Sequence, residues 1–197
     1  MIARPIVLIS FAPNTLSARV LLVVAGSLLI ALAAQVAVPL PWSPVPVTGQ
    51  TFAVLLIGAA FGGRLGAATV ALYLAEGLAG LPVFAPGGPV GPARFLGPTG
   101  GYLLGFVAAA YVVGTLAERG WDRRLVTAAL AMLLGEVVIY AFGLAGLARF
   151  VPADRLLTAG LLPFIPGDLV KLALAALALP TAWRLVGRVH PLPPFRD

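Results

Sequence analysis

The stretch PFIPGDLVKLALAALALP, residues 163–180, places one aspartate and one lysine in an otherwise apolar segment. Asp168 and Lys171 are three residues apart, so a helix would hold both on one face. A charge inside a membrane costs about 2.5–3.5 kcal/mol on insertion scales, and such residues are usually functional. The structural alternative is that the helix dipole stabilises the negative charge of Asp168, just after Pro166, and that Lys171 neutralises this charge. The stretch therefore predicts a membrane helix that carries a ligand contact or a local ion pair.

The whole chain has the composition of an integral membrane protein. Of its 197 residues, 60% are hydrophobic and 10% are charged, whereas soluble domains contain about 25% charged residues. A spanning helix needs about 20 apolar residues, so this length predicts an all-α bundle of about six transmembrane helices. Residues 1–197 would form a single domain. The chain has no cysteine, which excludes disulfides and thiolate chemistry, and its net charge of +6 is too dispersed to indicate nucleic-acid binding.

Glycine- and proline-rich connections divide the chain into six apolar segments. The first ends in small residues that resemble a signal-peptidase site, but its apolar run is longer than a signal-peptide core, so we expect a helix there. The second and third are short for a full span, which leaves a re-entrant hairpin as an alternative. The expected helices cover residues 17–37, 50–61, 65–79, 102–116, 125–147 and 166–189.

Basic residues are distributed unequally between the two sides of the predicted bundle. Of the 13 lysines and arginines, nine lie near the termini, in the turn between the second and third segments or in the loop between the fourth and fifth. Three lie in the opposite loops, and Lys171 lies inside the sixth segment. Because cytoplasmic loops are enriched in basic residues, both termini are predicted to be cytoplasmic. The irregular loops would then lie outside and Asp168 near the outer boundary of the membrane, as in an outward-facing pocket covered by loops.

Further polar residues could contribute to such a pocket. Arg94 is the only basic residue in its outer loop; it could bind a carboxylate bidentately or be solvated. Thr48 and Gln50 lie where the proline-rich loop meets the second segment, although Thr48 could simply cap the helix. Glu136 and Tyr140 are four residues apart and share a helix face, where they could contact a ligand or hydrogen-bond between helices.

The sequence lacks the motifs of the common membrane enzymes and ATPases. It has no G-x-x-x-x-G-K-[ST], H-E-x-x-H or G-x-S-x-G motif. Its one histidine, His190, cannot build a triad or zinc site alone, and no acidic pair is spaced for a metal. We therefore expect no enzymatic activity, no metal and no cofactor. A solitary ion-coupled carrier remains an alternative, with Glu136 or Asp168 as the ion site. An integral membrane enzyme that acts on a lipid is a weaker alternative, because it would want clustered acids near the cytoplasmic face and the sequence lacks them.

Four stretches of the chain resemble the BioY family: VPLPWSPVPVTGQTFAVLLIGAAFGGRLGA, LYLAEGLAGLPVFAPGG, GPTGGYLLGF and PFIPGDLVKL. Those proteins are the biotin-specific substrate-binding (S) components of energy-coupling factor (ECF) transporters. The resemblance implies a six-helix S-component fold in the inner (plasma) membrane, with biotin bound near the outer surface. It also implies a transmembrane coupling (T) subunit and a pair of cytoplasmic ABC ATPases as partners, and these partners alone would use ATP.

The resemblance also implies roles for individual residues. The G-D-x-x-K match points to Asp168 and Lys171 as contacts of the biotin head group. Glu76 departs from the family pattern, in which an apolar or small residue is expected. The family's first helix often presents small residues to the coupling subunit, although such residues also pack within membrane bundles. The corresponding residues here are Ala25, Ala33 and Ala37.

The predicted orientation can be tested with a reporter that is active only outside the cytoplasm. Fused after Asp197, the reporter should stay inactive, because the lysine and arginine count places that end of the chain in the cytoplasm. Strong reporter activity in intact cells would show that the orientation is inverted.

Overall fold

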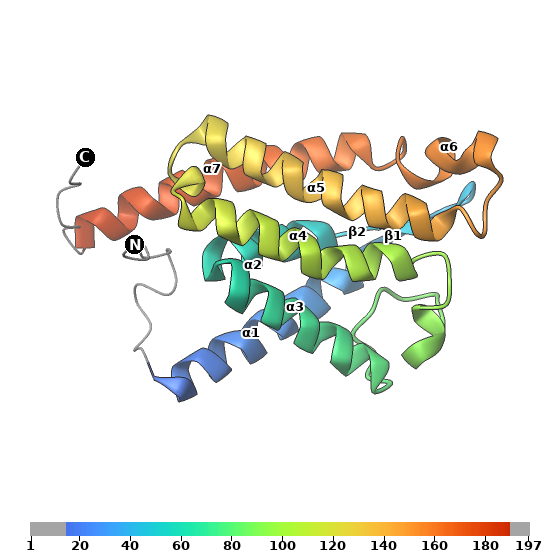
Figure 1. Ribbon diagram of the computed structural model, residues 1–197, viewed down its shortest axis with the longest axis horizontal. Helices are drawn as coiled ribbons and strands as arrows, with labels where there is room; N and C mark the ends of the chain where they lie inside the picture. Colours follow the sequence, from blue (N-terminus) through green and yellow to red (C-terminus); the bar gives the residue numbers. More distant parts are fainter. Residues whose placement is uncertain (1–14, 190–197) are drawn as a thin grey trace.

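The computed structural model describes residues 15–189, with side chains described as far as residue 184; His190 lies outside the described residues. All six predicted segments are helical (Figure 1). A short hairpin, a one-turn helix α6 and three 3-10 turns connect them. The long helices are α1 (Leu16–Gln35), α2 (Gln50–Phe61), α3 (Gly63–Leu78), α4 (Gly100–Glu118), α5 (Leu125–Leu147) and α7 (Ile165–Val189). The connections are β1 (Ala37–Leu40), β2 (Ser43–Thr48), η1 (Gly91–Arg94), η2 (Trp121–Arg123), η3 (Ala153–Arg155) and α6 (Leu156–Gly160).

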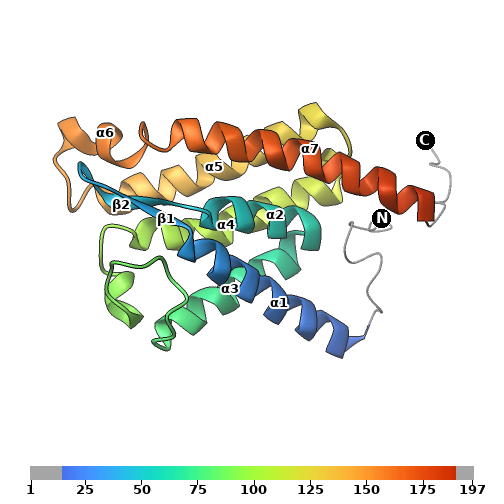
Figure 2. The same ribbon diagram turned by 180° about the vertical axis from the view of Figure 1, so that it is seen from behind.

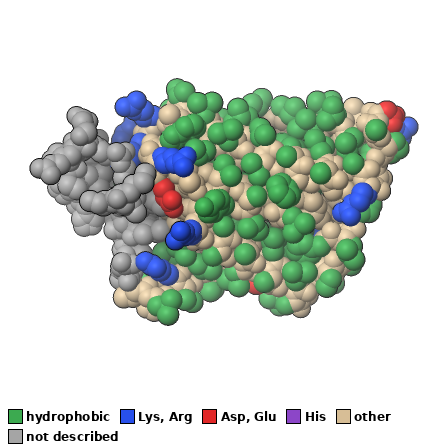
Figure 3. Space-filling view, viewed as in Figure 1, with side chains coloured by type: hydrophobic (Ala, Val, Ile, Leu, Met, Phe, Trp, Pro, Cys, Tyr) green, Lys and Arg blue, Asp and Glu red, His purple; other side chains and the backbone are tan. Residues whose placement is uncertain are grey.

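The two ends of the helical bundle differ in character. The start of α1, the α2–α3 turn, η2 and the last turns of α7 lie at one end, and the hairpin, η1 and α6 lie at the other (Figures 1 and 2). We call these the basic end and the loop end. Lysine and arginine side chains gather at the basic end, and the flank between the two ends is mostly hydrophobic (Figure 3). This is the surface of a protein that is surrounded by lipid along its length.

Four of the described helices are long and apolar enough to cross a membrane, namely α1, α4, α5 and α7. Helices α2 and α3 have only 12 and 16 residues, so α2 extends about 18 Å at 1.5 Å per residue. The extended strand β2 leads directly into α2 (Figure 2), so α2 begins inside the bundle rather than at its edge. Non-helical backbone at this depth is tolerated where it lines a cavity or is covered by protein.

Helices α2, α3 and α4 approach one another at glycine positions. A Cβ on Gly58 would lie 2.7 Å from the carbonyl oxygen of Ala110, and one on Gly66 would lie 2.9 Å from the Cα of Gly58. A Cβ on Gly114 would lie 2.3 Å from the carbonyl carbon of Gly62. In lipid, helices associate through close packing rather than through the hydrophobic effect. Main-chain contact at these glycines therefore holds the centre of the bundle together.

The first helix ends earlier than predicted. It stops at Gln35, and Ala37 is the first residue of β1. The predicted step of Ala33 and Ala37 on one helix face is therefore wrong. Ala33 is half-buried, and its carbonyl oxygen would lie 2.7 Å from a Cβ on Gly49. Of the three predicted contact residues, Ala25 alone is exposed. The helix ends here because the backbone from Ala37 onward forms β1 and pairs with β2 instead of continuing the helical turns.

Glu76 has a structural partner. The hydroxyl of Ser27, which is fully buried on α1, donates to Oε1 of Glu76 on α3 at 3.0 Å. A carboxylate at this position therefore links the first helix, which is otherwise packed only along one side, to the bundle.

The basic end is closed by contacts between α7 and η2. The indole Nε1 of Trp183 donates to Oδ2 of Asp122 at 2.5 Å, and the guanidinium of Arg123 lies over the Trp183 ring, 4.4 Å from its centroid. Burial raises the pKa of the Asp122 carboxyl, because the charged form loses its hydration. The part of α7 at the basic end is thus fixed to the loop between α4 and α5.

Candidate functional site

A pocket opens at the loop end, between the hairpin, the starts of α2 and α7, and the facing sides of α4 and α5. Its empty volume, including the mouth open to solvent, is about 570 Å³. Most of its walls are apolar and aromatic, including Phe84, Tyr102 and Phe164. Six of the sequence-predicted site residues line it: Thr48, Gln50, Arg94, Tyr140, Asp168 and Lys171.

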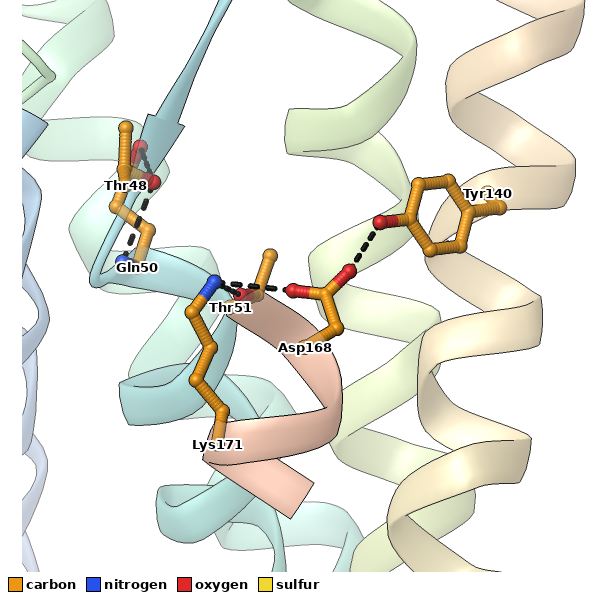
Figure 4. A network of polar contacts seen from close by, with 6 residues as sticks. All are labelled: Thr48, Gln50, Thr51, Tyr140, Asp168 and Lys171. Atoms are coloured by element: carbon orange, nitrogen blue, oxygen red, sulfur yellow. Dashed lines mark hydrogen bonds and ion pairs between the residues drawn. The ribbon is translucent and has the colours of Figure 1, made fainter. Parts of the chain in front are cut away.

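Asp168 and Lys171 form an ion pair that joins three helices (Figure 4). The Nζ atom of Lys171 lies 3.0 Å from Oδ1 of Asp168 and donates to Oγ1 of Thr51 on α2 at 2.9 Å. The hydroxyl of Tyr140 on α5 donates to the other carboxylate oxygen of Asp168. This arrangement is more than a local helix cap, because it ties α7 to both α2 and α5.

The pair retains hydrogen-bonding capacity for a ligand. An ammonium group has three donors, and Lys171 uses two of them within the protein, on Asp168 and Thr51. A carboxylate offers about four acceptor positions, and the Asp168 side chain receives one bond from Lys171 and one from Tyr140. The start of α7 can therefore both donate to and accept from a bound polar group.

The start of α2 supplies an oriented amide. Gln50 is buried, and its Nε2 donates to the hydroxyl of Tyr73 on α3. The hydroxyl of Thr48 donates to Oε1 of Gln50 at 3.2 Å and accepts from the Gln50 backbone N–H at 3.3 Å. The helix N-cap is Gly49 rather than Thr48. Thr48 thus supports both the first helical N–H and the amide side chain, but it is not the N-cap.

Arg94 is a buried pocket residue rather than a solvated loop residue. Its side chain is 6% exposed, and its Nη2 donates to the carbonyl oxygen of Ala85 at 2.7 Å. The guanidinium occupies the space left by Gly88, where a Cβ would lie 1.4 Å from Nη1. Burial lowers the pKa of the guanidinium from its ordinary value. Within the described part of the chain, Arg94 forms no ion pair, so its charge can attract an anionic group.

Arg94 also lies between two neighbouring cavities. A second hollow lies between the hairpin and residues 86–89, on the outer side of the pocket. The two cavities share Pro46, Arg94 and Thr99 in their walls. The side chain of Arg94 therefore contributes to the walls of both cavities.

Glu136 does not line this pocket, contrary to its predicted role as a ligand contact. It is 5% exposed on α5 and faces an apolar groove between α5 and α7, behind Tyr140 and Asp168. Its Oε2 has no hydrogen-bond partner among the described residues. Four-residue spacing placed Glu136 and Tyr140 on one face correctly, but Glu136 lies one turn farther from the loop end.

Sequence reasoning missed several residues of the site. Thr51 follows Gln50 directly and could have been suspected from that position. Phe84 and Tyr102 lie within the motifs G-L-P-V-F and G-P-T-G-G-Y, yet aromatic residues in apolar segments give no separate signal. Tyr102 is also held in place, because its hydroxyl donates to the carbonyl oxygen of Gly160 at 2.7 Å. Its ring then packs edge-on against Tyr140, with the centroids 6.4 Å apart.

The arrangement suits the binding of a small molecule. Donors and acceptors lie at the inner wall, aromatic surfaces lie between, and a cation lies near the mouth. Among the described residues, no group of three or more metal-binding side chains is placed to hold a metal ion. The best match is a ligand with a neutral polar head, an apolar body and an anionic tail.

Comparison with known proteins identifies relatives along almost the whole chain. The model of the BioY family matches residues 9–188. A probable biotin transporter BioY from Pyrococcus horikoshii is 42% identical over 154 residues, covering 78% of this chain and 87% of the relative. The biotin transporter BioY from Rhodobacter capsulatus is 39% identical over 171 residues, covering 79% and 87%. The crystal structure of the S-component for biotin from an ECF-type ABC transporter matches with a TM-score of 0.74 at 26% identity, covering 93% of this chain and 97% of that one.

Proposed function

This chain belongs to the BioY family, and we propose from that premise that it is the biotin-binding membrane subunit of an ECF-type vitamin importer. It captures biotin at the loop end, which faces outward, and delivers it inward. A transmembrane coupling subunit and a pair of cytoplasmic ABC ATPases complete the importer in the plasma membrane. The subunit itself needs no cofactor, and its partners consume the ATP.

The fit between the pocket and the chemistry of biotin carries this proposal. The ureido ring of biotin has two N–H donors and one strong carbonyl acceptor, and burying them unpaired would cost a few kcal/mol. Asp168 can accept from an N–H while Lys171 donates to the carbonyl oxygen, since both keep free capacity. The aromatic walls accommodate the sulfur ring and the aliphatic chain. Arg94 near the mouth supplies a cation for the carboxylate.

The ion-coupled carrier is a weaker explanation of the same residues. Asp168 is already neutralised by Lys171, so it is poorly suited to bind a further cation. Glu136, the other candidate, lies in a groove with apolar walls that offers a cation few oxygen ligands. The polar residues of the pocket are thus better explained by a neutral head group.

The proposal predicts that the purified protein binds labelled biotin with one-to-one stoichiometry in detergent. Binding should need neither ATP nor an ion gradient, because the described pocket contains all the groups assigned to recognition. Binding is measured by equilibrium dialysis, with and without sodium. Absence of binding would contradict the proposed function, and strictly sodium-dependent binding would favour the ion-coupled carrier.

The ion pair can be tested with the variants Asp168→Asn and Lys171→Met. Charge-assisted hydrogen bonds contribute about 1.5–3 kcal/mol each, so Asp168→Asn should weaken biotin binding roughly tenfold to a hundredfold. Asp154→Asn is the control, since Asp154 is exposed on η3 at the same end. Near-normal affinity together with a lowered melting temperature in both site variants would mean that the pair is only structural.

Arg94 can be tested with two ligands that differ only in charge. Arg94→Ala should weaken biotin about tenfold or more but should affect biotin amide much less, because the amide lacks the carboxylate. Arg155→Ala is the control, because Arg155 is an exposed arginine at the loop end. Equal losses for both ligands would show that Arg94 does not pair with the carboxylate.

A further inference from the structure

Side chains from three different elements hold one wall of the pocket. Residues 83–85, here called the strap, contribute Phe84 and Ala85 to the pocket wall without forming a helix or strand. The three consecutive carbonyl oxygens of the strap accept hydrogen bonds from Tyr73 on α3 at 3.2 Å, Gln35 on α1 at 3.3 Å and Arg94 at 2.7 Å, in that order. The position of the strap therefore depends on side-chain donors rather than on a backbone ladder.

One of these donors also contacts the start of α2. The hydroxyl of Tyr73 donates to the carbonyl oxygen of residue 83 and accepts from Nε2 of Gln50. Its side chain is 0% exposed and is not part of the pocket wall. The ring packs edge-on against Phe84, with the centroids 5.4 Å apart. A single buried oxygen thus connects the amide at the start of α2 to the strap.

This connection determines how the Gln50 amide is presented. Its oxygen accepts from Thr48, and one N–H of Nε2 donates to Tyr73. An amide has two N–H donors and two acceptor lone pairs, so one donor and one acceptor position remain for a ligand. If the amide rotated and exchanged its oxygen and nitrogen, the Tyr73 hydroxyl would have to donate to the amide oxygen and would lose its bond to the carbonyl oxygen of residue 83.

We infer that Tyr73 is a positioning residue for ligand capture. Without touching the ligand, it orients the Gln50 amide toward the pocket and holds the strap next to that amide. This inference rests on the proposed function for the identity of the ligand, but the hydrogen-bond connection does not. Removing the hydroxyl should loosen both walls at once, because Gln50 loses its acceptor and the strap loses one of its three donors.

Tyr73→Phe tests the inference, because it removes one oxygen and keeps the ring that packs on Phe84. We expect biotin affinity to fall about fivefold to twentyfold, the effect of one buried hydrogen bond. Because Tyr73 acts on both Gln50 and the strap, adding Tyr73→Phe to Gln50→Ala should cause a smaller loss than in the wild-type background, namely the part that comes from the strap. The same loss in both backgrounds would overturn the inference, as would wild-type affinity in Tyr73→Phe.

The strap can be followed independently of the ligand. The chain has no cysteine, so Ala85→Cys introduces a single thiol at a position that is 5% exposed. Its labelling by a water-soluble maleimide should be several times faster when Tyr73→Phe is added, and unchanged labelling would overturn the role in holding the strap.

Tyr111→Phe is the control, because Tyr111 is 50% exposed on α4, and it should change neither readout. Failure of the wild-type protein to bind biotin would count against the proposed function, while the labelling rates would still report on the strap.

Discussion

The ion pair between Asp168 and Lys171 constrains where the surrounding helices can lie. Two charges in an apolar bundle persist only when they neutralise each other and their remaining hydrogen-bonding groups find partners. Both conditions are met here, because Thr51 and Tyr140 reach the pair from α2 and α5. Helix α2 must therefore begin inside the bundle, and the hairpin before it must run down to that depth. The pocket forms where these requirements coincide.

The same condition explains how irregular backbone is accommodated at the loop end. The strap has no ladder of its own, and its carbonyl groups are satisfied by Tyr73, Gln35 and Arg94. The opposite end is held by a different contact, in which Trp183 donates to the buried carboxyl of Asp122. Helix α7 is thus fixed at both ends, by the ion pair at the pocket and by an aromatic donor at the basic end.

Much of this architecture follows from the sequence, since long apolar segments between glycine- and proline-rich connections predict the helices well. Asp168 and Lys171 could be predicted as site residues, because few charged residues occur in apolar segments. Tyr73 gave no such signal: its role depends on which segments become neighbours, and local patterns do not encode that. The sequence also does not show how far along a helix the pocket extends. The four-residue spacing therefore grouped Glu136 with Tyr140, although of these two only Tyr140 lines the pocket. The end of α1 was misjudged because pairing with β2, rather than local preference, determines it.

Close main-chain contact at Gly58, Gly66 and Gly114 has a consequence for how this sequence can vary. Lipid-facing leucines can be exchanged for other apolar residues, because the bilayer adapts to their shape. The three glycines face carbonyl groups and Cα atoms of neighbouring helices at 2.3–2.9 Å from a would-be Cβ, and backbone cannot move aside as a flexible side chain can. Even alanine would force whole helices apart and disturb the depth at which α2 presents its polar residues. The positions least open to change therefore include residues that have no side chain at all.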